Sequence, residues 1–194
     1  MVRIIAGHSK GFLLKVPGKT NRVRPTADRV KEAIFSVIGD RVVNARILDL
    51  FCGVGNLGLE ALSRGAQNCW FIEQNAVCVR FLKENLTRLK YMEQACVIRG
   101  ECGRAVQSAI PAAMRFDIVF ADPPYNETDR WFTESRNGIN LLKVLCQYDT
   151  FSSPALFVLE HASKYKIPED LVQGFSSKTK RYGSTSVTFL EYNP

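Results

Sequence analysis

Short apolar runs alternate with segments of helical periodicity from residue 45 onward, and this order restricts the fold more than any other feature. A series of strand, helix and strand predicts a doubly wound α/β fold with a mostly parallel sheet. The predicted strands are residues 47–51, 69–73, 95–98, 118–121 and 155–160, and the predicted helices are residues 57–64, 75–90, 103–110 and 141–146.

The sequence predicts a β-hairpin at each end of the chain. Residues 176–192 form one hairpin around Gly183, and the sheet then ends antiparallel, because parallel strands need longer crossovers. Residues 2–6 and 12–16 form the other hairpin, with Lys10 at its tip. The polar stretch 126–140 resembles a loop, and we expect it to be mobile.

The basic charge is concentrated at the N-terminus. Residues 1–31 hold eight basic side chains and one acidic one, which accounts for the whole net charge of +7. Thr26 is a good N-cap for a helix that Gly39 ends, so Arg24 and Arg29 flank a helix start that also attracts anions. A solvated basic face is the ordinary explanation, but such a concentrated imbalance favours a nucleic acid partner.

Composition restricts the class of protein further. The 194 residues suit one globular unit, with 46% hydrophobic and 23% charged side chains. We expect a cytoplasmic protein, because the chain has neither an apolar run of membrane-spanning length nor an N-terminal leader. The six cysteines lack a Cys-x-x-Cys spacing and lie far from His8 and His161, so we expect free thiols and no metal site.

A glycine-rich segment follows the first strand of this sheet. Gly53, Gly55 and Gly58 satisfy G-x-G-x-x-G between a strand and a helix, and Glu73 ends the next strand. Such glycines let the backbone approach a ligand, while the acidic residue accepts bonds from ribose hydroxyls. A cluster of helix-packing glycines is the alternative. The complete context of strand, turn, helix, strand and acid favours an adenosine cofactor.

Two cofactors contain such an adenosine, NAD and S-adenosylmethionine, and the carboxylate of Asp49 discriminates between them. Asp49 would repel a dinucleotide pyrophosphate, but it suits the cationic amino group of a methionine tail. S-adenosylmethionine is therefore favoured. Glu101 and Cys102 fall where adenine could be bonded, although a plain helix N-terminus explains Glu101 equally well. The predicted cofactor-binding residues are Asp49, Phe51, Cys52, Gly53, Gly55, Glu73, Gln74, Glu101 and Cys102.

A second motif ends the strand at 118–121. Pro123 and Pro124 cannot continue a sheet, so Asp122 and Tyr125 are held at a rigid strand end. Carboxylate and carbonyl oxygens accept N–H bonds from an exocyclic amine, and the ring stacks on its base. A strand followed by a proline turn is the alternative, and the upstream glycine motif makes it less probable.

The two motifs together resemble class I methyltransferases that act on amines, and nearly the whole chain resembles the RsmD family. That family methylates N2 of one guanine in 16S ribosomal RNA. Cys52, Val54 and Glu101 depart from residues that are common in it. The resemblance rests on Arg3-Ile-Ile-Ala-Gly, Arg24-Pro-Thr, Asp28-Arg29-Val30-Lys31-Glu32, Gly58-Leu-Glu-Ala-Leu-Ser-Arg-Gly-Ala, Asp122-Pro-Pro-Tyr, and Lys180-Arg-Tyr-Gly followed by Val187-Thr-Phe.

The resemblance implies a Rossmann-like class I methyltransferase sheet with an N-terminal β-hairpin. Residues 1–39 would be an RNA-binding extension, and residues 40–194 a catalytic unit that uses S-adenosylmethionine. The partner would be 16S ribosomal RNA or an assembling small subunit, and the protein a monomer. It implies catalytic roles for Asp122, Pro123, Pro124 and Tyr125, and RNA contacts for Arg3, Lys10, Arg24, Thr26 and Arg29.

Three alternatives remain open from the sequence. The same Asp-Pro-Pro-Tyr motif serves methyltransferases of adenine N6 or cytosine N4 in DNA. A non-catalytic RNA-binding assembly factor could keep the fold, although intact Asp49, Glu73 and Asp122 argue against it. An NAD oxidoreductase is the most distant of the three.

Overall fold

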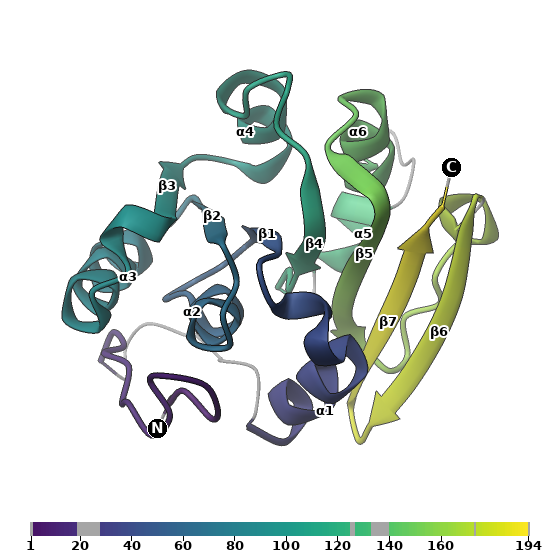
Figure 1. The fold of residues 1–194 in the computed structure, drawn as a ribbon. Coiled ribbons are helices and arrows are strands. Elements are labelled where there is room, and N and C mark those ends of the chain that lie inside the picture. Colours follow the sequence, from purple (N-terminus) through teal and green to yellow (C-terminus); the bar gives the residue numbers. More distant parts are fainter. Residues whose placement is uncertain (1, 19–27, 125–126, 133–139, 173, 194) are drawn as a thin grey trace.

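The computed structural model describes residues 2–18, 28–124, 127–132, 140–172 and 174–193. These residues contain a seven-stranded sheet in the order β3-β2-β1-β4-β5-β7-β6 (Figure 1). The strands are β1 (Arg46–Leu50), β2 (Asn68–Glu73), β3 (Ala95–Arg99), β4 (Phe116–Ala121), β5 (Phe151–Ala162), β6 (Phe175–Tyr182) and β7 (Thr185–Tyr192).

Strand directions agree with the sequence pattern. β1 pairs in parallel with β2 and β4, and the parallel pairing continues to β3 on one side and β5 on the other. β7 is antiparallel to both β5 and β6. Gly183, with φ +64°, makes the turn between β6 and β7. The predicted mostly parallel sheet with an antiparallel end is therefore confirmed.

Helices cover both faces of the sheet (Figure 1). Helices α1 (Asp28–Ile38), α2 (Asn56–Ser63) and α3 (Ala76–Leu89) pack through one apolar cluster on one face. Helices α4 (Cys102–Ala109), α5 (Thr128–Phe132) and α6 (Leu141–Gln147) pack through a second cluster on the other face. Short 3-10 helices occur at η1 (Gly39–Val42), η2 (Met92–Gln94) and η3 (Glu169–Val172). None of the helices within the described ranges has the length and apolar character that a membrane span requires.

The N-terminal hairpin is less regular than predicted. Within the described part of this segment, the two arms form one antiparallel bridge, between Arg3 and Leu13, and no extended strands. Backbone bonds between the arms join Ile4 to Phe12 and Leu14 to Val2, whereas the N–H groups of Ile5 and Ala6 bind the Glu60 carboxylate of α2.

The stretch 126–140 contains a helix that the sequence analysis did not predict. In α5, Trp131 and Phe132 are buried against the sheet, and Phe132 packs edge-on to Phe157 of β5. Two aromatic side chains are enough to anchor this short helix, although its neighbours in the sequence are polar. The expected mobility of residues 126 and 133–139 concerns positions outside the described residues.

Candidate active site

The glycine-rich loop leaves β1 in a conformation that strongly favours glycine. Gly53 and Gly55 have φ values of +56° and +88°, and Phe51 also has a positive φ, +57°. A Cβ atom at Gly55 would lie 2.5 Å from Leu82 Cδ1 of α3. The loop therefore requires glycine both for its dihedral angles and for its close approach to α3.

Asp49 lies beneath this loop and holds the start of α2. Its carboxylate accepts a 2.8 Å bond from the Gly58 N–H, and its side chain is almost completely buried. Burial raises the pKa of Asp49 to about 7, while the Gly58 N–H opposes that rise and the charge of Glu73 adds to it. A Cβ atom at Gly58 would lie 2.9 Å from Asp49 Oδ2, so glycine is needed for this contact.

Glu73 holds the other side of the same loop from the end of β2. One carboxylate oxygen accepts a 2.9 Å bond from the Gly53 N–H, and the other accepts a 2.7 Å bond from the Asn75 N–H. Gln74 follows with an exposed side chain. The carboxylates of β1 and β2 thus both support the loop, a role that the G-x-G-x-x-G pattern did not specify.

Glu101 and Cys102 lie at the start of α4. Glu101 is the N-cap, and its two oxygens accept bonds of 2.9 and 3.1 Å from the N–H groups of Gly103 and Arg104. Cys102 is buried, which raises the pKa of its thiol. The helix-terminus explanation of Glu101 therefore holds, and a contact with adenine stays a prediction.

The Asp-Pro-Pro motif lies beside the glycine loop. β4 ends at Ala121, which pairs with Leu50 at the end of β1, so Asp122 and Phe51 leave neighbouring parallel strands at the same edge. Asp122 is half-buried, Pro123 is buried, and the Pro124 carbonyl accepts a 2.7 Å bond from the Glu127 N–H. Tyr125 lies outside the described residues.

Trp131 of α5 contacts the glycine loop. Its ring lies edge-on to Phe51, with 5.1 Å between the ring centroids. The helix that follows the Asp-Pro-Pro motif is thereby packed against the predicted cofactor segment. The sequence analysis missed Trp131, because two adjacent aromatic residues within a polar stretch give no periodic signal.

His161 also lies near this edge of the sheet, on β5. Its Nδ1–H donates to the Ala162 carbonyl at 3.0 Å, so Nε2 accepts from the Thr188 hydroxyl at 3.0 Å. Burial lowers the pKa of His161. A neutral imidazole with both nitrogens bonded is poorly suited to act as a general base.

The predicted RNA-binding residues are only partly within the described chain. Lys10 and Arg29 have exposed side chains, whereas Arg24 and Thr26 lie outside the described residues. Arg3 is exposed and forms a 3.0 Å ion pair with Asp28. Lys31, which contributed to the basic count, is completely buried beside Glu60 and does not belong to the basic surface.

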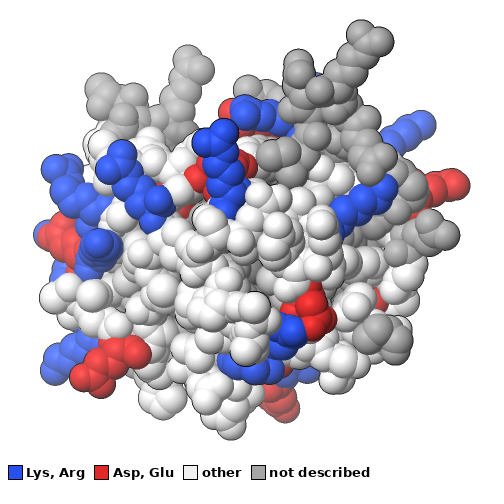
Figure 2. All heavy atoms as spheres, turned by 90° about the horizontal axis from the view of Figure 1, so that it is seen from above, with Lys and Arg blue, Asp and Glu red and all other residues white. Residues whose placement is uncertain are grey.

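Figure 2 shows the side of the molecule that carries α4 and α6. In Figure 1 the N-terminal segment and α1 lie below the sheet, and α4 and α6 lie above it. The view from above shows a broad uncharged area with Lys, Arg, Asp and Glu dispersed around it (Figure 2). Among the described residues of the N-terminal segment and α1, the exposed basic side chains are Arg3, Lys10, Lys15 and Arg29.

Comparisons with known proteins agree with the motifs. Residues 2–191 match the family described as conserved hypothetical protein 95. The chain is 35% identical over 190 residues to the putative rRNA methyltransferase YlbH of Bacillus subtilis, covering 98% of each chain. It is 34% identical over 159 residues to ribosomal RNA small subunit methyltransferase D of Haemophilus influenzae, covering 82% of this chain and 78% of that one.

A solved structure extends the likeness to three dimensions. The putative methyltransferase yhhF from Escherichia coli superposes with a TM-score of 0.80 at 30% identity, covering 99% of this chain and 98% of that one. The Rossmann-like class I methyltransferase fold is therefore confirmed. Together these matches show that the chain belongs to the family described as conserved hypothetical protein 95, the RsmD family of methyltransferases.

Proposed function

We propose that this protein transfers a methyl group from S-adenosylmethionine to the exocyclic N2 amine of a guanine in 16S ribosomal RNA. The observation that carries the proposal is the adjacency of β1 and β4, which brings the glycine loop and the Asp-Pro-Pro motif to one sheet edge. The small-subunit ribosomal RNA substrate is supported by the names of the relatives.

The residues around the loop fit S-adenosylmethionine. At Gly53 the backbone has no side chain that would keep a ligand away, whereas the glycine at 55 makes room for Leu82 of α3. Glu73 lies at the end of β2, where a carboxylate accepts bonds from ribose hydroxyls. We assign Asp49 to the cationic amino group, and Glu101 with Cys102 to adenine. When bound, this cofactor supplies an electrophilic methyl group on a sulfonium ion.

The chain's own task is to orient a weak nucleophile. The lone pair of guanine N2 is conjugated with the ring, so hydrogen-bond acceptors that favour a pyramidal amine increase its reactivity. The Asp122 carboxylate and the Pro123 carbonyl are the acceptors that we assign, and Tyr125 would stack on the base. Such positioning lowers a barrier by several kcal/mol, and the acceptors also stabilise positive charge on the nitrogen.

A strong general base is not required before attack in this proposal. The amine proton is lost after the nitrogen has become positively charged and therefore acidic. The state of His161 supports this account, because both of its ring nitrogens are already bonded within the protein. The target guanine must leave its stacked position to reach Asp122, as bases do in other base-modifying enzymes.

The N-terminal residues 1–39 are the part of the chain that we assign to RNA binding. Exposed Lys10 and Arg29 lie in the N-terminal segment and in α1, which pack through the same apolar cluster. Their charges would contact phosphates, which position RNA without reading its sequence. We assign Arg3, Arg24 and Thr26 to the same surface.

Substitution of Asp122 tests the proposed chemistry. We expect Asp122→Ala to abolish methyl transfer to 16S ribosomal RNA while calorimetry still detects binding of S-adenosylhomocysteine. Asp40→Ala is the matched control, because Asp40 is exposed in η1 and should leave transfer unchanged. Normal turnover by the Asp122→Ala protein would contradict the assignment.

A further inference from the structure

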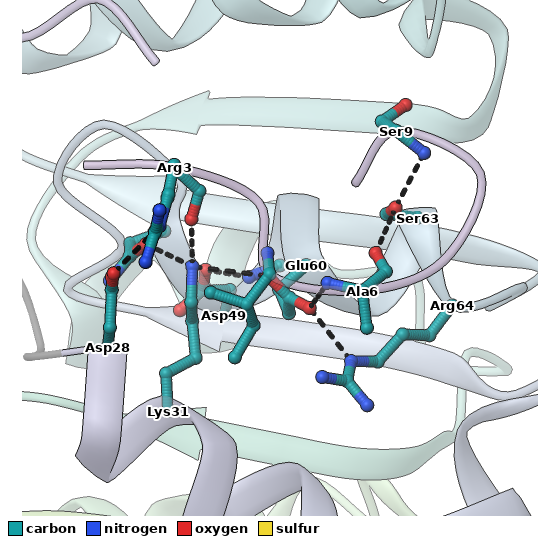
Figure 3. A network of polar contacts seen from close by, with 12 residues as sticks. Arg3, Ala6, Ser9, Asp28, Lys31, Asp49, Glu60, Ser63 and Arg64 are labelled. Carbon is teal, nitrogen blue, oxygen red and sulfur yellow. Dashed lines mark hydrogen bonds and ion pairs between the residues drawn. The ribbon is translucent and has the colours of Figure 1, made fainter. Parts of the chain in front are cut away.

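A buried ion pair joins the N-terminal part of the chain to the helix that follows the glycine loop. Lys31 of α1 and Glu60 of α2 lie 3.1 Å apart, and both side chains are 0% exposed (Figure 3). The two residues belong to separate sequence motifs, and neither has a role in the proposed transfer chemistry.

Glu60 receives the backbone of the N-terminal segment. Its Oε2 accepts a 2.8 Å bond from the Ile5 N–H, and its Oε1 accepts bonds from the Ala6 N–H at 3.0 Å and Arg64 Nε at 2.8 Å. By accepting both N–H groups, this carboxylate fixes the path of the segment on α2.

Ser63 continues the same attachment one turn further along α2. Its hydroxyl donates to the Ala6 carbonyl at 2.6 Å and accepts a 3.0 Å bond from the Ser9 N–H (Figure 3). A Cβ atom at Gly7 would lie 1.8 Å from the Ser63 carbonyl oxygen. The segment that leads to Lys10 therefore lies directly on α2.

Lys31 extends the connection to the cofactor loop. Its ammonium group donates to the Arg3 carbonyl at 2.6 Å and to Asn56 Oδ1 at 2.9 Å, in addition to the Glu60 ion pair. Asn56 is the first residue of α2 and directly follows Gly55. Burial lowers the pKa of Lys31 despite the opposing charge of Glu60.

One buried cation therefore depends on two elements. If the N-terminal segment or the first turn of α2 becomes disordered, Lys31 loses a hydrogen-bond acceptor. Because Lys31 is buried, the loss of that acceptor costs folding free energy. Order in either element therefore favours order in the other. A ligand that orders one element should raise the affinity of the other element for its own ligand, and this effect is reciprocal.

We propose that Lys31 and Glu60 are positioning residues that couple RNA binding on the N-terminal segment to cofactor binding at the glycine loop. This inference rests on the proposed function, because it assigns RNA to the first element and S-adenosylmethionine to the second. A buried ion pair is often unnecessary for stability, since apolar replacements can stabilise a protein equally well. Coupling gives this pair a function beyond stability.

The test measures the dissociation constant of S-adenosylhomocysteine with and without a saturating unmodified 16S ribosomal RNA transcript. For the wild-type protein we expect RNA to tighten the binding of S-adenosylhomocysteine about 5- to 50-fold. S-adenosylhomocysteine should tighten RNA binding by the same factor, which we call the coupling factor. In the Lys31→Met and Glu60→Gln variants, the coupling factor should fall toward one, whichever ligand's affinity is measured. Arg41→Met is the matched control, because Arg41 lies outside residues 1–39 and pairs with exposed Glu191 of β7. Its coupling factor should stay at the wild-type value.

Asn56→Ala keeps the inference testable if the ion-pair variants do not fold. It removes the Lys31 acceptor next to the glycine loop, while the bonds from Ile5 and Ala6 to Glu60 stay in place, and we expect the coupling factor to fall. A coupling factor of one in the wild-type protein would overturn the inference, and so would an unchanged coupling factor in all three variants. Failure of the wild-type protein to bind either ligand would instead contradict the proposed function.

Discussion

At pH 8, replacement of Asp49 by asparagine should both stabilise the protein and weaken cofactor binding. In the folded protein the pKa of Asp49 is raised from 3.8 to about 7, chiefly by burial. At about 1.4 kcal/mol for each tenfold change in proton affinity, this rise corresponds to about 4 kcal/mol of folding free energy.

The sign follows from proton linkage. The folded protein holds the Asp49 proton more tightly than the unfolded chain does, so this residue lowers stability as the pH rises from about 4 to 7, and its penalty is complete above pH 7. Asparagine keeps an oxygen that accepts from the Gly58 N–H and removes the buried charge. Its amide N–H groups add a cost of about 1–3 kcal/mol that does not depend on pH.

The effect of the buried charge is isolated by comparing, at two pH values, the stability difference between Asp49→Asn and wild type. We expect the stability of Asp49→Asn relative to wild type to increase by about 2–3 kcal/mol between pH 5 and pH 8. Urea denaturation of the two proteins without cofactor, at constant ionic strength, measures this quantity. Asp40→Asn, at an exposed position of η1, is the control and should show little change.

Cofactor binding should change in the opposite direction. Loss of a charge-assisted hydrogen bond to the amino group of S-adenosylmethionine should weaken its binding about 10- to 150-fold at pH 8. A stability difference that does not vary with pH would refute the burial argument for Asp49. Unchanged cofactor affinity would refute its assignment to the methionine tail.

Three further substitutions test other parts of the account. Arg29→Ala should weaken RNA binding and reduce the slope of log affinity against log salt by about one, without affecting S-adenosylhomocysteine affinity; an unchanged salt slope would remove Arg29 from the RNA surface. Gly58→Ala should lose about 1–3 kcal/mol in urea denaturation, because its Cβ would lie 2.3 Å from Phe71 Cε1, whereas Gly18→Ala, with open space around it, should not. Glu101→Ala should lose about 1 kcal/mol with its N-cap, and calorimetry with S-adenosylhomocysteine would show whether the carboxylate also contributes to cofactor affinity.

The centre of the sheet could be predicted because β1, β4 and β5 are mostly buried. Each parallel strand is then a short apolar run, and the helices between them keep their own period. The C-terminal hairpin was equally clear, because Gly183 provides its turn. Helix α5 gave no such signal, since Trp131 and Phe132 are adjacent in sequence and form no helical repeat.

The candidate site was harder to derive from local patterns. The glycine loop and the Asp-Pro-Pro motif are each visible in the sequence, but the neighbouring positions of β1 and β4 depend on the topology of the whole sheet. The pairing of Lys31 with Glu60 was missed because charged residues on amphipathic helices usually face solvent. Glu60 is far from Lys31 in the sequence, and only the packing of α1 beside α2 shows that the two charges neutralise each other.

The most direct test of the central claim identifies the methylated nucleoside. The purified protein would be incubated with methyl-labelled S-adenosylmethionine and, in separate reactions, unmodified 16S ribosomal RNA, small-subunit particles or duplex DNA. The account predicts labelled N2-methylguanosine from the RNA or the particles. Labelled methyladenine or methylcytosine from the DNA would contradict the assigned substrate, and the absence of label from every reaction would contradict the proposed activity.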